Sequence, residues 1–173
     1  MSGRLMLRRM TAHHIDSVVR LSEACELPAW SADTFFRELQ LERRDYRVAV
    51  LRRRSIGFGG MMTVLDDAHL MVMGVDPAFR RRGVAVLLFG SLLEAARKDG
   101  CQSVTLEVRV ENRAAQALYR RFGMTAEGVR PRYYEDGTDA VIMWHRDIRA
   151  RSSVQLHRRL VRRARAQWNA SEC

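Results

Sequence analysis

The chain has 173 residues, 47% of them hydrophobic, and a formal net charge of +10. This length suits one domain with a full core, and no apolar run approaches the ~20 residues that a membrane helix needs. The mixed residues at the N-terminus and three widely spaced cysteines (Cys25, Cys101 and Cys173) lead us to expect no secretion, reduced thiols, no membrane contact and a cytoplasmic location.

The first 75 residues alternate between strand-like and helix-like patterns. A strand with alternating apolar residues begins near Leu5, and Thr11 is placed to cap a helix that ends near Cys25. Residues 26–30 break that helix. We then expect a helix that begins at Ser31 or Asp33, a hairpin of strands at 46–51 and 56–65, and a strand at 69–75.

The second half continues this alternation. Val84, Leu88, Leu92 and Ala95 have helical spacing, and Gly100 ends their helix. The pattern as a whole predicts a mixed α/β domain without an internal repeat. The remaining expected elements are a strand at 104–110, a helix that Asn112 caps and Gly123 ends, and strands at 124–129 and 140–148.

A basic glycine loop stands directly before the helix at residue 84. Arg80, Arg81 and Arg82 precede Gly83, and Ala85 follows it. A helix start offers free backbone N–H groups and the positive end of the helix dipole, and small residues let a phosphate approach them. The loop therefore predicts an anion cradle, with an ordinary solvated basic turn as the alternative.

Several motifs follow one another in a recognisable order. They lie at 73–77, 80–85, 106–109, Asn112, 117–119 and 122–124. In order and spacing they resemble the GNAT acetyltransferase superfamily, and most closely its ribosomal-protein-alanine N-acetyltransferase (RimI-type) branch. The resemblance covers roughly residues 4–148.

In GNAT folds two parallel strands splay apart and the cofactor lies in the gap. The resemblance therefore implies a mixed central sheet with a splayed pair at 70–75 and 104–110, flanked by helices, in a GNAT acetyltransferase domain at 1–148. It also implies acetyl-CoA as co-substrate. The cofactor-binding residues would be Met73, Gly74, Val75, Arg80, Arg81, Arg82, Gly83, Val84, Ala85, Val86 and Asn112.

Acetyl transfer to an amine requires a proton acceptor for the amine and benefits from an acid near the departing thiolate. Glu107 lies on the polar face of its strand, where an ion pair with Arg109 is the alternative role. Tyr119 follows Asn112 by two helical turns, where a half-buried core aromatic is the alternative. In RimI-type enzymes a glutamate and a tyrosine at the matching positions accept and donate the protons. The resemblance thus implies that Glu107 and Tyr119 are catalytic.

The resemblance places the acceptor site between the loop after the first helix and the last hairpin. Pro28 and Trp30 resemble a family Pro-Trp loop with one inserted residue, and Tyr133 and Tyr134 resemble its tyrosine turn. Tyrosines there would hydrogen-bond an extended peptide, with hairpin packing as the alternative. We expect the enzyme to acetylate the N-terminal α-amine of a protein, with a ribosomal protein as the expected acceptor. The acetyl group would pass directly from acetyl-CoA to the amine in a ternary complex. A small-amine acetyltransferase of the same fold and a non-catalytic RNA- or ribosome-binding module are the rival functions.

Histidines and cysteines show no metal-ligand spacing, so we expect no metal. The safer interpretation of all five histidines is a surface or packing role. For Cys25 it is a buried structural thiol, with a catalytic nucleophile as the alternative.

Residues 149–173 form a basic amphipathic C-terminal tail with seven arginines and one acid. Leu156, Leu160, Ala164 and Trp168 fall four residues apart, as on one face of a helix. This stripe either docks on the domain or on a second subunit, or the tail's arginines contact ribosomal RNA. Because the tail lies beyond the family-like region, the chemistry is not expected to require it.

Overall fold

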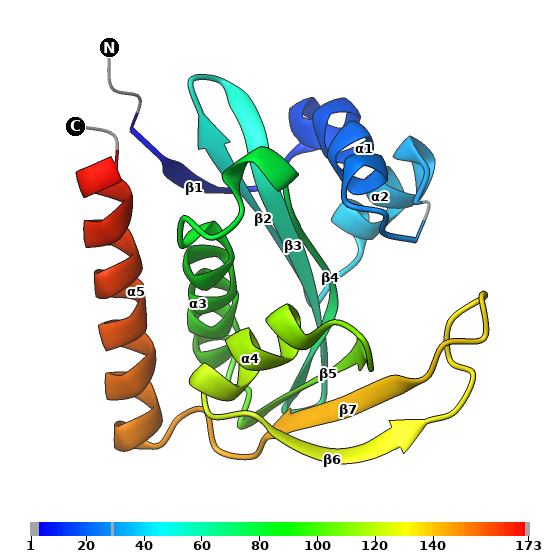
Figure 1. The fold of residues 1–173 in the computed structure, drawn as a ribbon, viewed down its shortest axis with the longest axis vertical. Helices are drawn as coiled ribbons and strands as arrows, with labels where there is room; N and C mark the ends of the chain where they lie inside the picture. The colour runs from blue at the N-terminus through cyan, green and yellow to red at the C-terminus, as the bar shows by residue number, and fades with distance from the viewer. Residues whose placement is uncertain (1–3, 29, 172–173) are drawn as a thin grey trace.

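The computed structural model describes residues 4–28 and 30–171, which form one seven-stranded sheet with helices on both faces (Figure 1). Single turns of 3-10 helix at Ala12–His14 and Pro77–Phe79 precede α1 and α3. The elements are β1 (Met6–Arg9), α1 (Ile15–Ala24), α2 (Ala32–Gln40), β2 (Arg44–Leu51), β3 (Arg54–Val64), β4 (Asp67–Val75), α3 (Val84–Lys98), β5 (Ser103–Arg109), α4 (Arg113–Arg121), β6 (Thr125–Arg130), β7 (Ala140–His145) and α5 (Arg151–Ser171).

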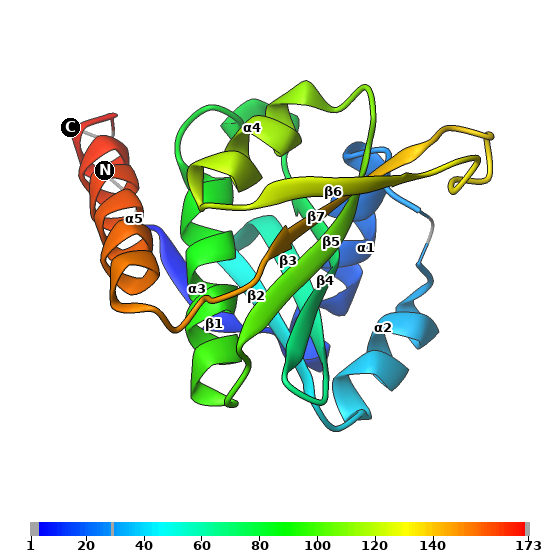
Figure 2. The same cartoon turned by 90° about the horizontal axis from the view of Figure 1, so that it is seen from below.

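The strands lie in the order β1-β2-β3-β4-β5-β7-β6. β4 and β5 pair in parallel, with α3 as their crossover helix, and the other neighbouring strands pair antiparallel. α1 and α2 lie on one side of the sheet, α3 and α4 on the other, and α5 runs along the outside of α3 (Figures 1 and 2). The expected mixed α/β architecture is confirmed.

The parallel pair separates halfway along its length. β4 and β5 are in register from Asp67 with Ser103 to Leu70 with Leu106. Beyond that point β4 stays paired with β3 as far as Val75, while β5 stays paired with β7. A bulge beside Leu70 in the β3–β4 ladder falls where the separation begins, and bulges bend strands and increase their twist. The expected splayed pair is therefore present at the expected strands.

Two apolar clusters hold the sheet between its helices. One lies between the sheet and α1–α2 and centres on Phe35, Phe58 and Tyr46. The larger one lies on the α3 side and includes α3, α4 and the stripe of α5. Leu160, Ala164 and Trp168 of that stripe are buried there. The tail thus forms the expected amphipathic helix, and its apolar face packs on this chain's own sheet-and-helix core.

Element ends differ from the sequence expectations by a few residues. The last strand ends at His145 rather than 148, because Asp147 Oδ1 accepts hydrogen bonds from the N–H groups of Arg149 and Ala150 and turns the chain into α5. Cys173 lies outside the described residues. None of the helices within residues 4–28 and 30–171 combines the length and apolarity needed to cross a membrane.

Candidate active site

The basic glycine loop leads into α3 through a left-handed turn. Gly83 is the N-cap of α3 with φ +86°, a conformation that favours glycine, and Arg81 also has a positive φ of 64°. Asp76 stabilises the preceding turn, because its Oδ1 accepts from the Ala78 N–H and its Oδ2 pairs with Arg54 at 2.6 Å. No side chain in the described part of the chain caps the first turn of α3. Its N–H groups and dipole therefore remain available to an anion.

The three arginines of this loop are exposed at the mouth of the splay. Arg80 Nε donates to the carbonyl of Val75 at 3.2 Å, so this guanidinium lies at the end of β4. The Arg82 guanidinium lies 5.7 Å from the ring centroid of Phe79. The loop thus presents positive charge beside the start of α3, as an anion site requires.

Cys25 reaches the same end of β4. Its Sγ donates to the Val75 carbonyl at 3.3 Å, and burial raises the pKa of the Cys25 thiol above its ordinary value. A thiol with a raised pKa is a poor nucleophile. The geometry is that of a structural thiol, although Cys25 is half-buried rather than buried as expected.

Met73, Gly74 and Val75 line the inner edge of β4, where pairing with β5 has ended. A Cβ on Gly74 would come within 2.9 Å of Leu27 Cδ1 and 3.2 Å of Cys25 Sγ. The residue is therefore small because the segment after α1 packs directly on the strand. This edge has no strand partner on the β5 side, and the Val75 carbonyl there accepts from the Arg80 and Cys25 side chains.

Glu107 directly follows Leu106, the last residue of β5 that pairs with β4, and its side chain is only 9% exposed. Its Oε2 accepts from His69 Nε2 at 2.6 Å, and its Oε1 lies 3.3 Å from Arg130 Nη1. The hydrogen bond from His69, with the charges of His69 and Arg130, lowers the pKa of Glu107 below its ordinary value. The carboxylate is therefore ionised at neutral pH.

His69 and Arg130 are functional neighbours that the sequence analysis missed. His69 had been assigned a surface or packing role, whereas it hydrogen-bonds the candidate base. The expected alternative for Glu107, an ion pair with Arg109, is not the arrangement found, since Arg109 Nη1 pairs with Asp136 at 2.7 Å. The β4–β5 register, which places His69 opposite Thr105, brings His69 to Glu107, and the β5–β7–β6 pairing brings Arg130 to the same carboxylate.

Two arginines pack on the tyrosine rings of the loop between β6 and β7, and one of them, Arg130, also pairs with Glu107. The Arg130 guanidinium lies 5.6 Å from the ring centroid of Tyr133, and the Arg109 guanidinium lies 4.1 Å from that of Tyr134. The two tyrosine rings meet edge to face at 5.1 Å. The tyrosine turn and the candidate base thus belong to one arrangement.

Tyr119 lies on α4 and is 6% exposed, with its ring 5.2 Å from that of Phe89 in α3. Burial, with a smaller contribution from Tyr134, raises the pKa of Tyr119 well above its ordinary value. The phenol is therefore protonated at neutral pH. Glu107 in turn contributes to the raised pKa of Tyr134, whose main cause is burial, so Tyr134 interacts electrostatically with both candidate catalytic groups.

Asn112 caps α4 as expected, because its Oδ1 accepts from the Ala115 N–H at 3.0 Å. On the opposite side of the site, Pro28 is exposed, while Trp30 packs at 5.3 Å on the ring of Phe35. Ala29 between them lies outside the described residues. The Trp30 ring thus supports α2 as well as bordering the segment between α1 and α2.

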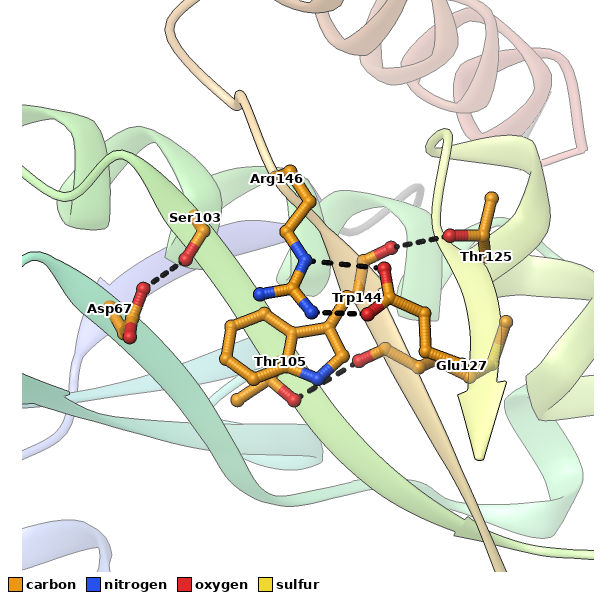
Figure 3. A network of polar contacts seen from close by, with 8 residues as sticks. Asp67, Ser103, Thr105, Thr125, Glu127, Trp144 and Arg146 are labelled. Carbon is orange, nitrogen blue, oxygen red and sulfur yellow. Dashed lines mark hydrogen bonds and ion pairs between the residues drawn. The ribbon is translucent and has the colours of Figure 1, made fainter. Parts of the chain in front are cut away.

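Polar contacts on the open face of β5, β6 and β7 hold the hairpin that carries the tyrosine turn (Figure 3). Arg146 stacks on Trp144 at 3.9 Å and pairs with Glu127 of β6. Thr105 Oγ1 of β5 donates to the Met143 carbonyl at 3.2 Å. These contacts fix β6 and β7 to each other and to β5, so the turn beyond them projects from an anchored base.

The described residues contain no group of three or more histidine, cysteine, aspartate or glutamate side chains arranged to hold a metal ion.

A splayed parallel strand pair that leads into a basic glycine loop at a helix start defines an acetyltransferase fold and site. The chain belongs to the Acetyltransferase (GNAT) family, whose sequence profile matches residues 15–124. It is an N-acetyltransferase enzyme.

Two relatives by sequence and one solved structure show which members of this family the chain resembles. A Bacillus subtilis protein, provisionally named a [ribosomal protein bS18]-alanine N-acetyltransferase, is 34% identical over 147 residues, which are 83% of this chain and 97% of that protein. The [ribosomal protein bS18]-alanine N-acetyltransferase of Salmonella typhimurium is 37% identical over 117 residues, which are 66% of this chain and 78% of that protein. The crystal structure of the ribosomal-protein-S18-alanine N-acetyltransferase from Escherichia coli superposes with a TM-score of 0.74 at 29% identity, covering 82% of this chain and 92% of that one.

Proposed function

We propose that this protein acetylates the N-terminal α-amine of a ribosomal protein in the cytoplasm, using acetyl-CoA. The observation that carries the proposal is the position of Glu107, an ionised carboxylate held by His69 and Arg130 at the point where β4 and β5 begin to separate. The names of the relatives described above support the same acceptor class. Within this proposal, residues 1–148 are the acetyltransferase domain and residues 149–173 are a basic extension.

Acetyl-CoA would lie across the splay with its pyrophosphate on the start of α3. Gly83 and the N–H groups of Val84, Ala85 and Val86 would cradle the phosphates, with Arg80, Arg81 and Arg82 adding charge-assisted contacts. The pantetheine arm would bond the open backbone edge at Met73, Gly74 and Val75. Asn112, exposed at the start of α4, would contact the cofactor from the other side of the gap.

The chemistry would be direct attack of the amine on the thioester. An α-amine has an ordinary pKa of ~7.7–8.0, so part of it is neutral at physiological pH and one carboxylate suffices to take its proton. Glu107 would accept that proton directly or through a water molecule. Tyr119, protonated because its pKa is raised, would donate a proton to the departing thiolate of CoA.

The acceptor would lie between the segment at Pro28 and Trp30 and the turn at Tyr133 and Tyr134. An extended peptide matches the exposed tyrosine turn, because its backbone offers groups that phenols can bond. A polyamine matches it poorly, since recognition of a polycation calls for unpaired acidic groups, whereas Asp136 and Glu107 beside these rings are paired with Arg109 and Arg130.

The test is mass spectrometry of N-terminal peptides incubated with acetyl-CoA and the enzyme. Peptides with a free α-amine should gain one acetyl group, whereas the same peptides with a blocked N-terminus and an internal lysine should gain none. A panel of polyamines and aminoglycosides tests the small-amine rival. Turnover of that panel alone would overturn the proposal, and the absence of any acetylation would favour the non-catalytic rival.

A second proposal concerns the partner of α5. Its exposed side carries Arg158, Arg159, Arg162 and Arg163, a row with like charges at i and i+4 that repel one another. RNA phosphates would relieve this repulsion and would hold the enzyme near a ribosomal acceptor.

Replacing all four of these α5 arginines by glutamine should abolish co-sedimentation of the enzyme with ribosomes at low salt. A control with the same net charge, in which Arg20, Arg37, Arg52 and Arg53 become glutamine, should retain it; equal loss in both would contradict a specific RNA contact.

A further inference from the structure

We propose that the C-terminal turns of α5 (residues 164–168) position the basic glycine loop for the cofactor, so that acetyl-CoA affinity depends on a helix outside the family-like region. The inference deepens the proposed function, because it rests on acetyl-CoA binding at this loop. It also reverses the expectation that the chemistry is independent of residues beyond 148.

Three contacts connect these turns to the loop. Ala164 lies against Gly83, where an added Cβ would come within 3.1 Å of the Ala164 Cβ. Gln167 Nε2 donates to the Arg81 carbonyl at 3.4 Å. The buried Trp168 ring lies 6.4 Å from the ring of Phe79 in the turn that opens the loop. The helix therefore contacts the loop at its beginning, middle and end.

Phe79 extends this support to the charged side chains. Arg82 and Arg54 both lie over its ring, at 5.7 and 5.9 Å from the centroid. Trp168 contacts the same ring, so the indole fixes the aromatic surface against which Arg82 rests. Removing the indole would leave Phe79 without this support and would give Arg82 more freedom.

The loop needs such support because its backbone adopts uncommon conformations. Both Arg81 and Gly83 have positive φ, and a non-glycine residue such as Arg81 is strained in that region. Arg80, Arg81 and Arg82 also repel one another when no phosphate is bound. A buried helix face at the back of the loop keeps it in the conformation that exposes the start of α3. This lowers the ordering cost of cofactor binding.

Earlier turns of α5 perform a different task. His157 Nε2 donates to the Phe122 carbonyl at 2.8 Å, and Val161 packs beside Gly90 in the middle of α3. Leu160 belongs to the same apolar cluster as Trp168, yet the contacts described for the loop come from residues 164–168. The helix therefore offers a matched control for loss of core packing alone.

The experiment compares Trp168→Leu with Leu160→Ala in the full-length chain, using calorimetric titration with CoA and thermal melting. Trp168→Leu should weaken CoA binding roughly tenfold, whereas Leu160→Ala should lower the melting temperature but leave affinity within about twofold. With an N-terminal peptide as acceptor, the KM for acetyl-CoA should rise in Trp168→Leu while kcat changes little.

Equal affinities in wild type and Trp168→Leu would overturn the inference, as would equal losses in both variants. If the wild type itself fails to bind CoA, the proposed function fails instead. Should Trp168→Leu not fold, hydrogen exchange in Gln167→Ala replaces it: amides at 79–86 should exchange faster than in wild type, and unchanged protection of those amides would contradict the inference.

Discussion

His69 Nε2 lies 2.6 Å from Glu107 Oε2, and this bond joins β4 to β5 at the point where their backbones separate. The two residues are 38 positions apart in the chain, and α3 crosses over between them. A hydrogen bond to a charged acceptor is stronger than a neutral one. The bond therefore holds the carboxylate at the closed end of the splay before any ligand arrives.

Glu107→Gln should lower turnover by about 10²–10⁴-fold, because the amide keeps the shape of the side chain but cannot take a proton. The pKa of Glu107 is lowered by His69 and Arg130, so the carboxylate stays charged wherever the acceptor amine titrates. The loss should therefore shrink as pH rises above ~8, where the amine deprotonates unaided. Measuring kcat/KM against pH tests this. Glu111→Gln, an exposed neighbour, is the control, and a wild-type rate in Glu107→Gln would remove the base assignment.

Tyr119→Phe should lower kcat while acetyl-CoA affinity changes little. The ring contact with Phe89 is retained and only the hydroxyl is lost, so the fold should persist. Acid catalysis contributes on the order of 10²–10⁴-fold, which sets the expected loss. Steady-state kinetics and calorimetry separate the two effects. Tyr46→Phe, which loses a buried hydroxyl bonded to Glu38 on the other side of the sheet, should keep full turnover.

Gly83→Asp should abolish measurable acetyl-CoA binding. The substitution places a negative charge at the anion cradle, and its Cβ would meet both a positive φ and Ala164. Gly100→Asp is the matched control: Gly100 also has a positive φ, 88°, at the other end of α3, but an added Cβ there meets nothing within 4 Å. Both variants should lose stability, and only the first should lose affinity. Calorimetry that finds equal affinity in the two folded variants would count against the cradle.

Stability should fall as pH drops from about 7 to 4, and His157 should contribute to the fall. Burial lowers the pKa of His157 from 6.5 to about 4. Between these values the unfolded chain binds a proton that the folded chain does not, so unfolding is favoured by acid. A shift of this size corresponds to roughly 3 kcal/mol, lost progressively through the window and fully lost below about pH 4.

His157→Gln supplies the comparison for that prediction. Glutamine keeps a donor for the Phe122 carbonyl and an acceptor for Arg97 Nη1 but does not titrate. Denaturant unfolding at pH 7, 5.5 and 4 should show a shallower pH dependence in this variant than in wild type. His145, which faces His157 at 5.5 Å and also has a pKa lowered by burial, accounts for part of the remaining slope. Identical slopes in both proteins would exclude His157 as a contributor.

Local patterns predicted most elements and the components of the candidate site. The loop before α3 was identified by its arginines and glycine, because helix starts and positive φ impose requirements that act within a few residues. The stripe of α5 followed from its four-residue spacing, which places those side chains on one face of any helix. The candidate roles of Glu107 and Tyr119 came from the family resemblance. The groups that surround these two side chains could be identified only in the folded structure.

Residue patterns along the chain are therefore sufficient to predict the helices and strands, the glycine loop and the amphipathic character of the tail. Which residues meet depends on how these elements pack. The β4–β5 register brings His69 to Glu107, the β6–β7 hairpin brings Arg130 to the same carboxylate, and the docking of α5 brings Trp168 to Phe79. Each of these contacts joins residues at least 23 positions apart, and such distances depend on how whole elements pack. Periodicity reports which face of an element is apolar, but it carries no information on the partner that covers that face.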